Sequence, residues 1–181
     1  YRLVGSEMCI RDSFKYNEAN PKNQMPLIVP SNEQGAGFMA SGYARSTGKA
    51  GVVMVTSGPG ATNTVTPVRD AMADSIPMVI ICGQVSRAAI GSDAFQEAPI
   101  SSVMGSVAKH VFLITNENKL AATLKAAFEV ATSGRPGPVV VDIPKDIQTA
   151  EISDEDHEEA NIAAYANRIL AIEESRMIEE K

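Results

Sequence analysis

Residues 51–63, GVVMVTSGPGATN, contain the change of pattern that decides the fold. The run GVVMVT is apolar and β-branched almost throughout, which is typical of a strand buried on both faces of a parallel sheet. The SGPG that follows predicts a tight turn, and we expect a helix over residues 61–74. A buried strand followed by a helix is the repeating unit of α/β proteins.

The same alternation continues on both sides of this stretch. We expect further strands at residues 25–29, 77–83, 110–115 and 139–144. We expect further helices at residues 33–46, 100–108 and 117–132. These elements predict an α/β fold, a doubly wound and mainly parallel sheet with helices on both faces. In such sheets ligands bind at the carboxyl ends of the strands, here residues 57–60, 83–85 and 144–146.

The 181 residues are enough for one domain, which we place at residues 14–148 and expect to be truncated at its N-terminus. Residues 1–13, YRLVGSEMCIRDS, follow no period, lack the apolar region of a signal peptide and resemble translated sequencing-adapter read-through. We expect a non-native or disordered segment there, with an ordinary N-terminal arm as the alternative. Residues 149–181 begin as an acidic linker and end with helical propensity.

Charge and composition exclude several classes of partner. The net charge of −6 and the pI of about 5.0 argue against nonspecific nucleic-acid binding, since phosphate contacts need a basic face. No apolar run is as long as a membrane span. Neither the two cysteines nor the two histidines have metal-ligand spacing, so we expect no metal site within this chain.

The helix predicted over residues 33–46 contains Gly35, Gly37 and Gly42, each of which costs about 1 kcal/mol relative to alanine. Its small residues fall one turn apart, which indicates close packing against the sheet, a second helix or a flat ligand. Glu33 stands at the helix N-terminus, where the helix dipole stabilises negative charge. By position alone, Glu33 is either a cap or a functional carboxylate aimed into a cleft.

The turn at residues 57–60 has the strand–glycine–helix plan of a phosphate loop. However, Asn63 stands where the dinucleotide fingerprint has its third glycine, and the Gly-Lys-Ser/Thr of a P-loop is missing. We therefore expect no diphosphate cradle. Pro59 stiffens the turn and Asn63 presents an amide, so the turn is either purely structural or a wall for a flat heterocycle.

Five motifs occur in one order: NEQGAGFMASGYARSTGKAGVVMVTSGPGATN from residue 32, DSIPMVIICGQV from 74, IGSDAFQE from 90, KH at 109–110, and GRPGPVVVDIPKD from 134. Together they resemble the N-terminal, pyrimidine-binding domain of the thiamine-diphosphate-dependent enzymes. Within that superfamily they are most similar to the acetolactate synthase (acetohydroxyacid synthase) catalytic subunits. The resemblance covers about residues 14–148 and implies the thiamine-diphosphate-binding fold. Residues 149–181 would then lead into the first helix of the family's central domain.

The resemblance also implies roles for individual residues. Glu33 matches the superfamily glutamate that hydrogen-bonds N1′ of the cofactor's aminopyrimidine and thereby promotes loss of the thiazolium C2 proton. Three positions match residues near the cofactor: Pro59, Asn63 and Gln96. Four positions match the channel to the reacting centre: Val85, Ala94, Phe95 and Lys145. A lysine there could attract the carboxylate of a 2-keto acid, or be a plain solvated residue of the turn. The family usually has histidine where this chain has Asn32, which puts any proton transfer at that position in doubt.

For function, the resemblance implies a fragment of acetolactate synthase, a transferase of branched-chain amino acid biosynthesis. The enzyme decarboxylates pyruvate and joins the two-carbon unit to a second 2-keto acid. This chain would hold only the pyrimidine end of thiamine diphosphate, while Mg²⁺ and FAD would bind to other domains, so the chain alone is expected to be inactive. The resemblance further implies a homodimer or tetramer with an intersubunit active site, a regulatory small subunit as a candidate partner, and the cytoplasm or a plastid or mitochondrial matrix.

Two alternatives stay open at this point. One is a sibling thiamine-diphosphate enzyme, such as a carboligase, a pyruvate oxidase or a sulfoacetaldehyde acetyltransferase, whose distinguishing residues would lie mainly in another domain. The other is a noncatalytic α/β binding module that docks onto partners through its small-residue helix. A downstream GDG motif followed by an asparagine motif would indicate the metal–diphosphate domain of an enzyme.

Overall fold

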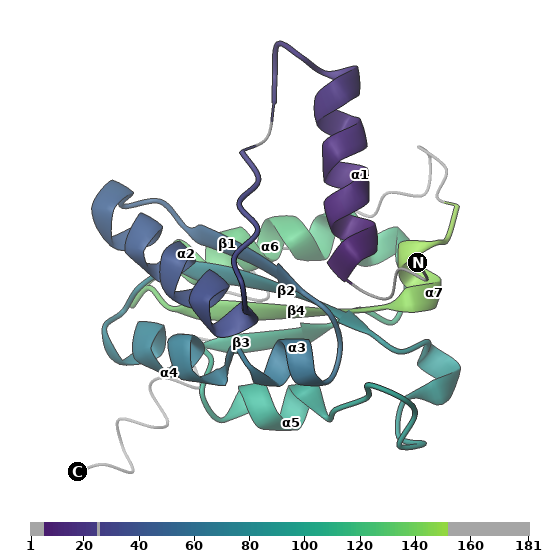
Figure 1. Cartoon of the computed structure of the whole chain (residues 1–181). Coiled ribbons are helices and arrows are strands. Elements are labelled where there is room, and N and C mark those ends of the chain that lie inside the picture. The colour runs from purple at the N-terminus through teal and green to yellow at the C-terminus, as the bar shows by residue number, and fades with distance from the viewer. Residues whose placement is uncertain (1–5, 25, 152–181) are drawn as a thin grey trace, which may run out of the picture.

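A four-stranded parallel sheet lies at the centre of the computed structural model (Figure 1), which describes residues 6–24 and 26–151, with side chains from residue 13 onward. The strands are β1 (Gly51–Val55), β2 (Met78–Gln84), β3 (His110–Leu113) and β4 (Pro138–Pro144), in the spatial order β1-β2-β4-β3. All three pairings are parallel. β4 lies between two neighbours and is buried along its whole length, which explains why its sequence is apolar at every position except Asp142.

Helices cover both faces of the sheet, as predicted for a doubly wound fold (Figure 1). One face packs against α2 (Glu33–Thr47), α4 (Val65–Ala73) and α5 (Ile100–Gly105), and Val53, Ile80 and Val140 point toward it. The other face packs against α6 (Leu120–Thr132), and Val79, Val139 and Val141 point toward it. The remaining helices are α1 (Ser6–Ala19), α3 (Pro59–Thr62), η1 (Arg87–Ala89), η2 (Glu117–Lys119) and α7 (Lys145–Gln148). None of these described helices is long and apolar enough to cross a membrane.

The strands predicted at residues 51–56, 77–83, 110–115 and 139–144 are confirmed, but the strand predicted at 25–29 is wrong. Met25 lies outside the described residues, and residues 26–29 belong to no strand. Ile28 and Val29 are 69% and 58% exposed. In the described chain β1 pairs only with β2, so this apolar segment has no neighbouring strand with which to form ladder hydrogen bonds.

The helix predicted over residues 61–74 is two helices, α3 and α4. Between them the hydroxyl of Thr64 donates to the carbonyl of Ala61 at 2.6 Å, and such local bonds compete with a continuous helix. Pro67, which has no backbone N–H, falls in the first turn of α4, where an N–H would lack a helical partner in any case. Because the two helices are separate, the turn before α3 sets the position of α3, and α4 does not.

The predicted domain limits, residues 14 and 148, lie close to the two ends of the described chain, at residues 6 and 151. α1 begins at Ser6 and so includes part of the segment predicted to be non-native or disordered, whose residues 1–5 lie outside the described chain. Residues 152–181, which contain most of the predicted linker and the following helix, also lie outside it. The boundaries 14–148 stay a prediction.

The small-residue face of α2 is the surface on which α4 and β1 pack. A Cβ added at Gly37 would lie 2.4 Å from Cγ of Pro67 in α4. A Cβ added at Gly51 of β1 would lie 2.2 Å from the carbonyl oxygen of Ala40 in α2. The glycines thus allow backbone approaches that larger residues would prevent, and the close packing offsets their poor helix propensity.

We expect Gly37→Ala and Gly42→Ala to change the free energy of unfolding in opposite directions. The added methyl group at position 37 meets Pro67, so we expect a loss of about 1–3 kcal/mol from overpacking. At Gly42 the added Cβ has no heavy atom within 4 Å, so alanine should stabilise the helix by about 1 kcal/mol. Urea denaturation of the 181-residue chain measures both changes. Equal effects at the two positions would contradict this packing.

The KH and GRPGP motifs lie at the amino end of the sheet, where they hold helix C-termini. The Lys109 ammonium donates to the carbonyls of Val130 in the last turn of α6, of its C-cap Ser133 and of Arg135 in the loop that follows. The Arg135 guanidinium donates to the carbonyls of Met72 and Ala73 at the end of α4. Cations at these positions satisfy carbonyls that lack helical partners, so both motifs have a structural role in this chain.

Candidate functional site

Glu33 is the first residue of α2, and its neighbour caps the helix. Asn32 has an extended backbone, and its Oδ1 accepts a hydrogen bond from the Gly35 N–H at 2.6 Å, which is the N-cap arrangement. The Glu33 side chain is therefore not required as the cap. It is half-buried and accepts a hydrogen bond at Oε2 from Nδ2 of Asn63, at 3.0 Å. Among the described residues Asn63 is the only side chain that donates to Glu33, and it does so at Oε2.

Asn63 reaches Glu33 because the turn after β1 aims α3 at the start of α2. Asn63 is the C-cap residue of α3, and Pro59 is the first residue of the same short helix. Both side chains are exposed. Two residues predicted to bind a cofactor are thus on one helical turn, and one of them is bonded to the predicted catalytic carboxylate.

Gly58 joins this turn to the loop that carries Gln96. Its φ of 56° and ψ of −114° lie outside the regions that L-residues favour. A Cβ added at Gly58 would lie 2.4 Å from the carbonyl oxygen of Gln96. Only glycine satisfies both conditions. Four of the predicted residues are consequently connected. A hydrogen bond joins Glu33 to Asn63, and the short helix α3 joins Asn63 to Pro59. The close backbone approach at Gly58 brings Gln96 to the same turn.

The loop of residues 86–99 is organised by Glu97, a residue that the sequence analysis did not single out. Its carboxylate accepts hydrogen bonds from the N–H groups of Gly91 and Ala94, and these bonds lower the pKa of Glu97. Gln96 has a positive φ of 60°, a conformation that persists only when its surroundings enforce it. Ala94 is half-buried, whereas Phe95 is 83% exposed, so this loop presents an aromatic ring outward.

Val85 and Lys145, the other predicted channel residues, leave the sheet at the same edge. They follow Gln84 and Pro144, which are paired in β2 and β4. Val85 is half-buried and Lys145 is exposed as the first residue of α7. The structure thus places both at the carboxyl ends of neighbouring strands, where ligands gather in parallel sheets.

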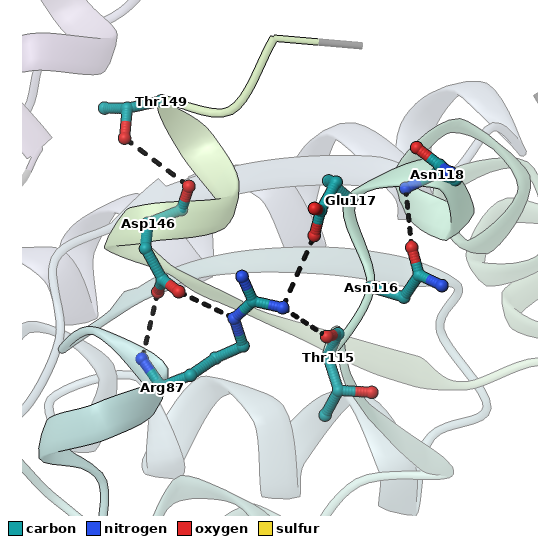
Figure 2. Close-up of polar contacts among 7 residues, drawn as sticks. All are labelled: Arg87, Thr115, Asn116, Glu117, Asn118, Asp146 and Thr149. Atoms are coloured by element: carbon teal, nitrogen blue, oxygen red, sulfur yellow. Dashed lines mark hydrogen bonds and ion pairs between the residues drawn. The ribbon is translucent and has the colours of Figure 1, made fainter. Parts of the chain in front are cut away.

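Figure 2 shows how Arg87 fastens this edge. Its Nε donates to Oδ2 of Asp146 at 2.6 Å, and its backbone N–H donates to Oδ1 of the same carboxylate at 2.9 Å. Its Nη1 donates to the carbonyl of Thr115 at 2.7 Å and contacts Glu117 at 3.3 Å. The Arg87 side-chain bond lowers the pKa of Asp146. Single exposed ion pairs stabilise little, but this group joins segments that follow three strands.

Asp142 is a buried acid in β4 that the sequence analysis passed over, although it is the only acidic residue in the run VVVDIP. Its side chain is 1% exposed, and its Oδ2 accepts a hydrogen bond from Nε2 of Gln84 at 3.0 Å. Its Oδ1 is buried with no partner in the described structure. Burial raises the pKa of Asp142 to about 6, and the Gln84 hydrogen bond opposes that rise.

The raised pKa predicts how stability depends on pH. Since the folded pKa of about 6 exceeds the ordinary value of 3.8, the stabilisation from protonating Asp142 is complete below pH 3.8 and is lost as the pH rises through 6. Asp142→Asn removes this titration and keeps the side-chain shape. Relative to the variant, the wild-type chain should lose roughly 3 kcal/mol of unfolding free energy between about pH 4 and pH 7.

Denaturation of both proteins across that range measures the difference. Asp146→Asn is the matched control, because a lowered pKa gives a contribution of opposite sign, present at neutral pH and lost as the pH falls. If the difference in unfolding free energy between the wild-type chain and Asp142→Asn stayed constant with pH, the raised pKa of Asp142 would be contradicted.

Among residues 6–24 and 26–151, no three His, Cys, Asp or Glu side chains gather in a way that could hold a metal ion. Cys82 is buried beside Asp142 in the core, and burial raises the pKa of its thiol far above the ordinary value, so it is unreactive. Near Glu33 the described residues thus provide a carboxylate held by the amide of Asn63, beside the turn of residues 57–60.

Residues 10–103 match the family described as thiamine pyrophosphate enzyme, N-terminal TPP binding domain. That range contains every predicted site residue except Lys145. Over 135 residues the chain is 53% identical to the mitochondrial acetolactate synthase catalytic subunit of Saccharomyces cerevisiae, covering 75% of this chain and 20% of that protein.

Two bacterial relatives give the same result. The chain is 51% identical over 137 residues to the acetolactate synthase large subunit of Corynebacterium glutamicum, covering 76% of this chain and 22% of that protein. It is 57% identical over 143 residues to the acetolactate synthase of Mycobacterium leprae, covering 79% of this chain and 22% of that protein. The chain therefore spans about a fifth of the length of the curated relatives that it matches.

Proposed function

Because the chain belongs to the thiamine pyrophosphate enzymes, through their N-terminal TPP binding domain, we propose that it forms the pyrimidine-binding part of an acetolactate synthase catalytic subunit. The observation that carries this proposal is the state of Glu33. Asn32 caps α2 in its place, and Asn63 holds one of its oxygens. A carboxylate placed in this way would be held in one orientation and could bind a ligand through its other oxygen, Oε1.

The residues present fit the pyrimidine end of thiamine diphosphate. Glu33 would hold a shared proton at Oε1 against a ring nitrogen, while Asn63 keeps the carboxylate oriented. Pro59 is exposed on the rigid turn and would face the flat ring. Gln96, held against Gly58, would present its amide toward the reacting atoms. When bound, thiamine diphosphate supplies the electron sink on which decarboxylation of a 2-keto acid depends.

The substrates would be pyruvate and a second 2-keto acid, joined to give the precursors of branched-chain amino acids. Val85, Ala94 and Phe95 would form the apolar wall of the approach to the cofactor. Lys145 would attract the substrate carboxylate, since a cation at a strand's carboxyl end raises the local concentration of anions. Mg²⁺, the diphosphate and FAD would be bound by parts of the enzyme outside this chain.

We expect the active site to lie between subunits of a homodimer or tetramer, with a regulatory small subunit as a further partner. In support, α2 exposes a run of large apolar side chains on the side away from α4 and β1, namely Phe38, Met39 and Tyr43, which are 43%, 47% and 50% exposed. This surface is on the helix that starts with Glu33. For location we propose the cytoplasm or an organelle matrix, since the relatives include mitochondrial and chloroplastic proteins.

A chimeric enzyme tests the proposal. In it, residues 14–148 of this chain replace the matched region of the Corynebacterium glutamicum large subunit. We expect it to form acetolactate from pyruvate only when thiamine diphosphate is added, whereas the same subunit with that region deleted should form none. A folded chimera that binds the cofactor without forming acetolactate would contradict the proposal.

The gene itself provides an independent test. Reading in frame beyond codon 181 should reveal a GDG motif followed by an asparagine motif, the signature of a domain that holds the metal and the diphosphate. A stop codon directly after residue 181 in genomic sequence would instead favour the noncatalytic binding module.

A further inference from the structure

The side chain of Gln84 connects the core of the sheet to the loop of residues 86–99. Gln84 is the last residue of β2 and is 6% exposed. Its Nε2 donates to Oδ2 of Asp142 at 3.0 Å and to the carbonyl of Ala98 at 3.4 Å. Its Oε1 accepts from the Val85 N–H at 2.9 Å. The three polar contacts of this buried amide therefore reach β4, Val85 directly before the loop and Ala98 near the end of the loop.

The arrangement of donors and acceptors sets the orientation of this amide. The oxygens of Asp142 and Ala98 both accept, so the NH₂ group has to face them, and the Val85 N–H has to face the amide oxygen. Exchanging the amide's nitrogen and oxygen would oppose acceptor to acceptor and donor to donor. Asp142 thus helps to hold the Gln84 amide in the orientation that turns its NH₂ group toward Ala98 and its oxygen toward Val85.

Asp142 is costly to keep in this position. It lies in the sheet between valine and isoleucine, and its Oδ1 is buried without a partner in the described structure. Leaving a buried acceptor without a hydrogen bond lowers the free energy of unfolding by more than one satisfied hydrogen bond raises it. Where a sequence breaks the packing rules of its own core, the expected reason is function.

We propose that Gln84 and Asp142 are a pair of positioning residues that hold the loop of residues 86–99, and with it Gln96, at the carboxyl edge of the sheet. The start of the loop is fixed by Arg87 and Asp146, and its interior is organised by Glu97. Gln84 fixes its far end at Ala98, whose carbonyl also accepts from the N–H of Ile100 at the start of α5. If the proposed function is right, this positioning keeps Gln96 and Phe95 beside the cofactor, so the consequence for catalysis rests on the proposed function.

Hydrogen exchange on the 181-residue chain tests the positioning without any activity. Gln84→Met keeps the length of the side chain but removes its donors. We expect the loop amides that donate to Glu97, those of Gly91 and Ala94, to exchange at least about tenfold faster, because the loop loses its attachment to β4. Amides within β2 and β4 should keep their protection.

Gln148→Met is the matched control. Gln148 lies at the same edge and donates from Nε2 to the carbonyl of Ile143 at 2.7 Å, so its replacement should leave the loop protected. Asp142→Asn, which keeps an acceptor for Gln84, should also leave the loop protected, whereas Asp142→Leu should open it. Should Gln84→Met not fold, Gln84→Asn carries the same expectation, because the shorter amide cannot reach both acceptors.

In the chimeric enzyme, Gln84→Met should lower kcat/KM for acetolactate formation by about 10- to 100-fold, the loss expected for one hydrogen bond to a charged group. The affinity for thiamine diphosphate should change less than about twofold, because Glu33 and Asn63 are untouched. Unchanged loop exchange in Gln84→Met, or equal opening in Gln148→Met, would overturn the positioning role. An inactive chimera with wild-type Gln84 would instead count against the proposed function, while the exchange experiment still decides the role of Gln84.

Discussion

Replacing Glu33 by glutamine in the chimeric enzyme should slow exchange of the cofactor's C2 hydrogen by about 10²- to 10⁴-fold, the range that a positioned acid–base group contributes. The amide keeps the shape of the carboxylate but cannot hold the shared proton. Because Asn32 caps α2, we expect the fold to lose at most about 1 kcal/mol, the value of a charge at a helix N-terminus. NMR of the bound cofactor in deuterated solvent measures the exchange rate.

Glu129→Gln is the control for this experiment. Glu129 is also a half-buried glutamate on a helix, but α6 packs on the face of the sheet away from α2 and α4. Its replacement should leave C2 exchange unchanged. If Glu33→Gln and Glu129→Gln exchanged the C2 hydrogen at the same rate, Glu33 would have no part in proton transfer and the proposed function would lose its mechanism.

Gly58→Ala should destabilise the 181-residue chain by about 3 kcal/mol or more. Two costs combine at this position: a backbone conformation that side chains disfavour, and a methyl group pressed against the carbonyl of Gln96. In the chimeric enzyme the same change should abolish acetolactate formation, because the turn and the loop of residues 86–99 can no longer meet. Thermal or urea denaturation measures the first effect and a product assay the second.

Gly91→Ala separates the cost of the backbone conformation from the cost of the steric contact. Gly91 has a positive φ of 86°, but no heavy atom lies within 4 Å of an added Cβ. Its replacement should therefore show the backbone cost alone, about 1–2 kcal/mol. Similar losses in Gly58→Ala and Gly91→Ala would mean that Gln96 does not pack on the turn as described.

The sequence was a sufficient guide where the signal was local. Continuous apolar runs predicted the positions of the four strands. The expected burial on both faces is found along β4, but it is wrong for β1, where Val52 and Met54 are 47% and 41% exposed, because β1 is an edge strand of the described sheet. The same reasoning failed at residues 26–29, since apolar character does not provide a neighbouring strand. It also missed the break between α3 and α4, which depends on the hydroxyl of Thr64 and the position of Pro67.

For the candidate site, the resemblance identified Glu33, Pro59, Asn63 and Gln96 as individual residues but gave no relation among them. The remaining predicted roles, at Val85, Ala94, Phe95 and Lys145, stay predictions that agree with positions at the carboxyl edge. Gly58 and Glu97 were quoted within motifs without a function, and Arg87 was not singled out. Gly58 and Arg87 act through partners elsewhere in the chain, Gln96 for Gly58 and Asp146 for Arg87, and a motif read alone does not name such a partner.

By itself, the sequence determined the α/β class and the parallel character of the sheet, because these follow from the periodicity and order of neighbouring residues. The resemblance added Glu33 at the start of α2 as the candidate carboxylate, a role that stays a prediction. Only the tertiary structure decided that Asn63 bonds Glu33, that Gln96 rests on Gly58 and that Gln84 links Asp142 to Ala98. These contacts join residues from different elements. They depend on the strand order β1-β2-β4-β3 and on how closely backbones approach, and no local pattern encodes either quantity.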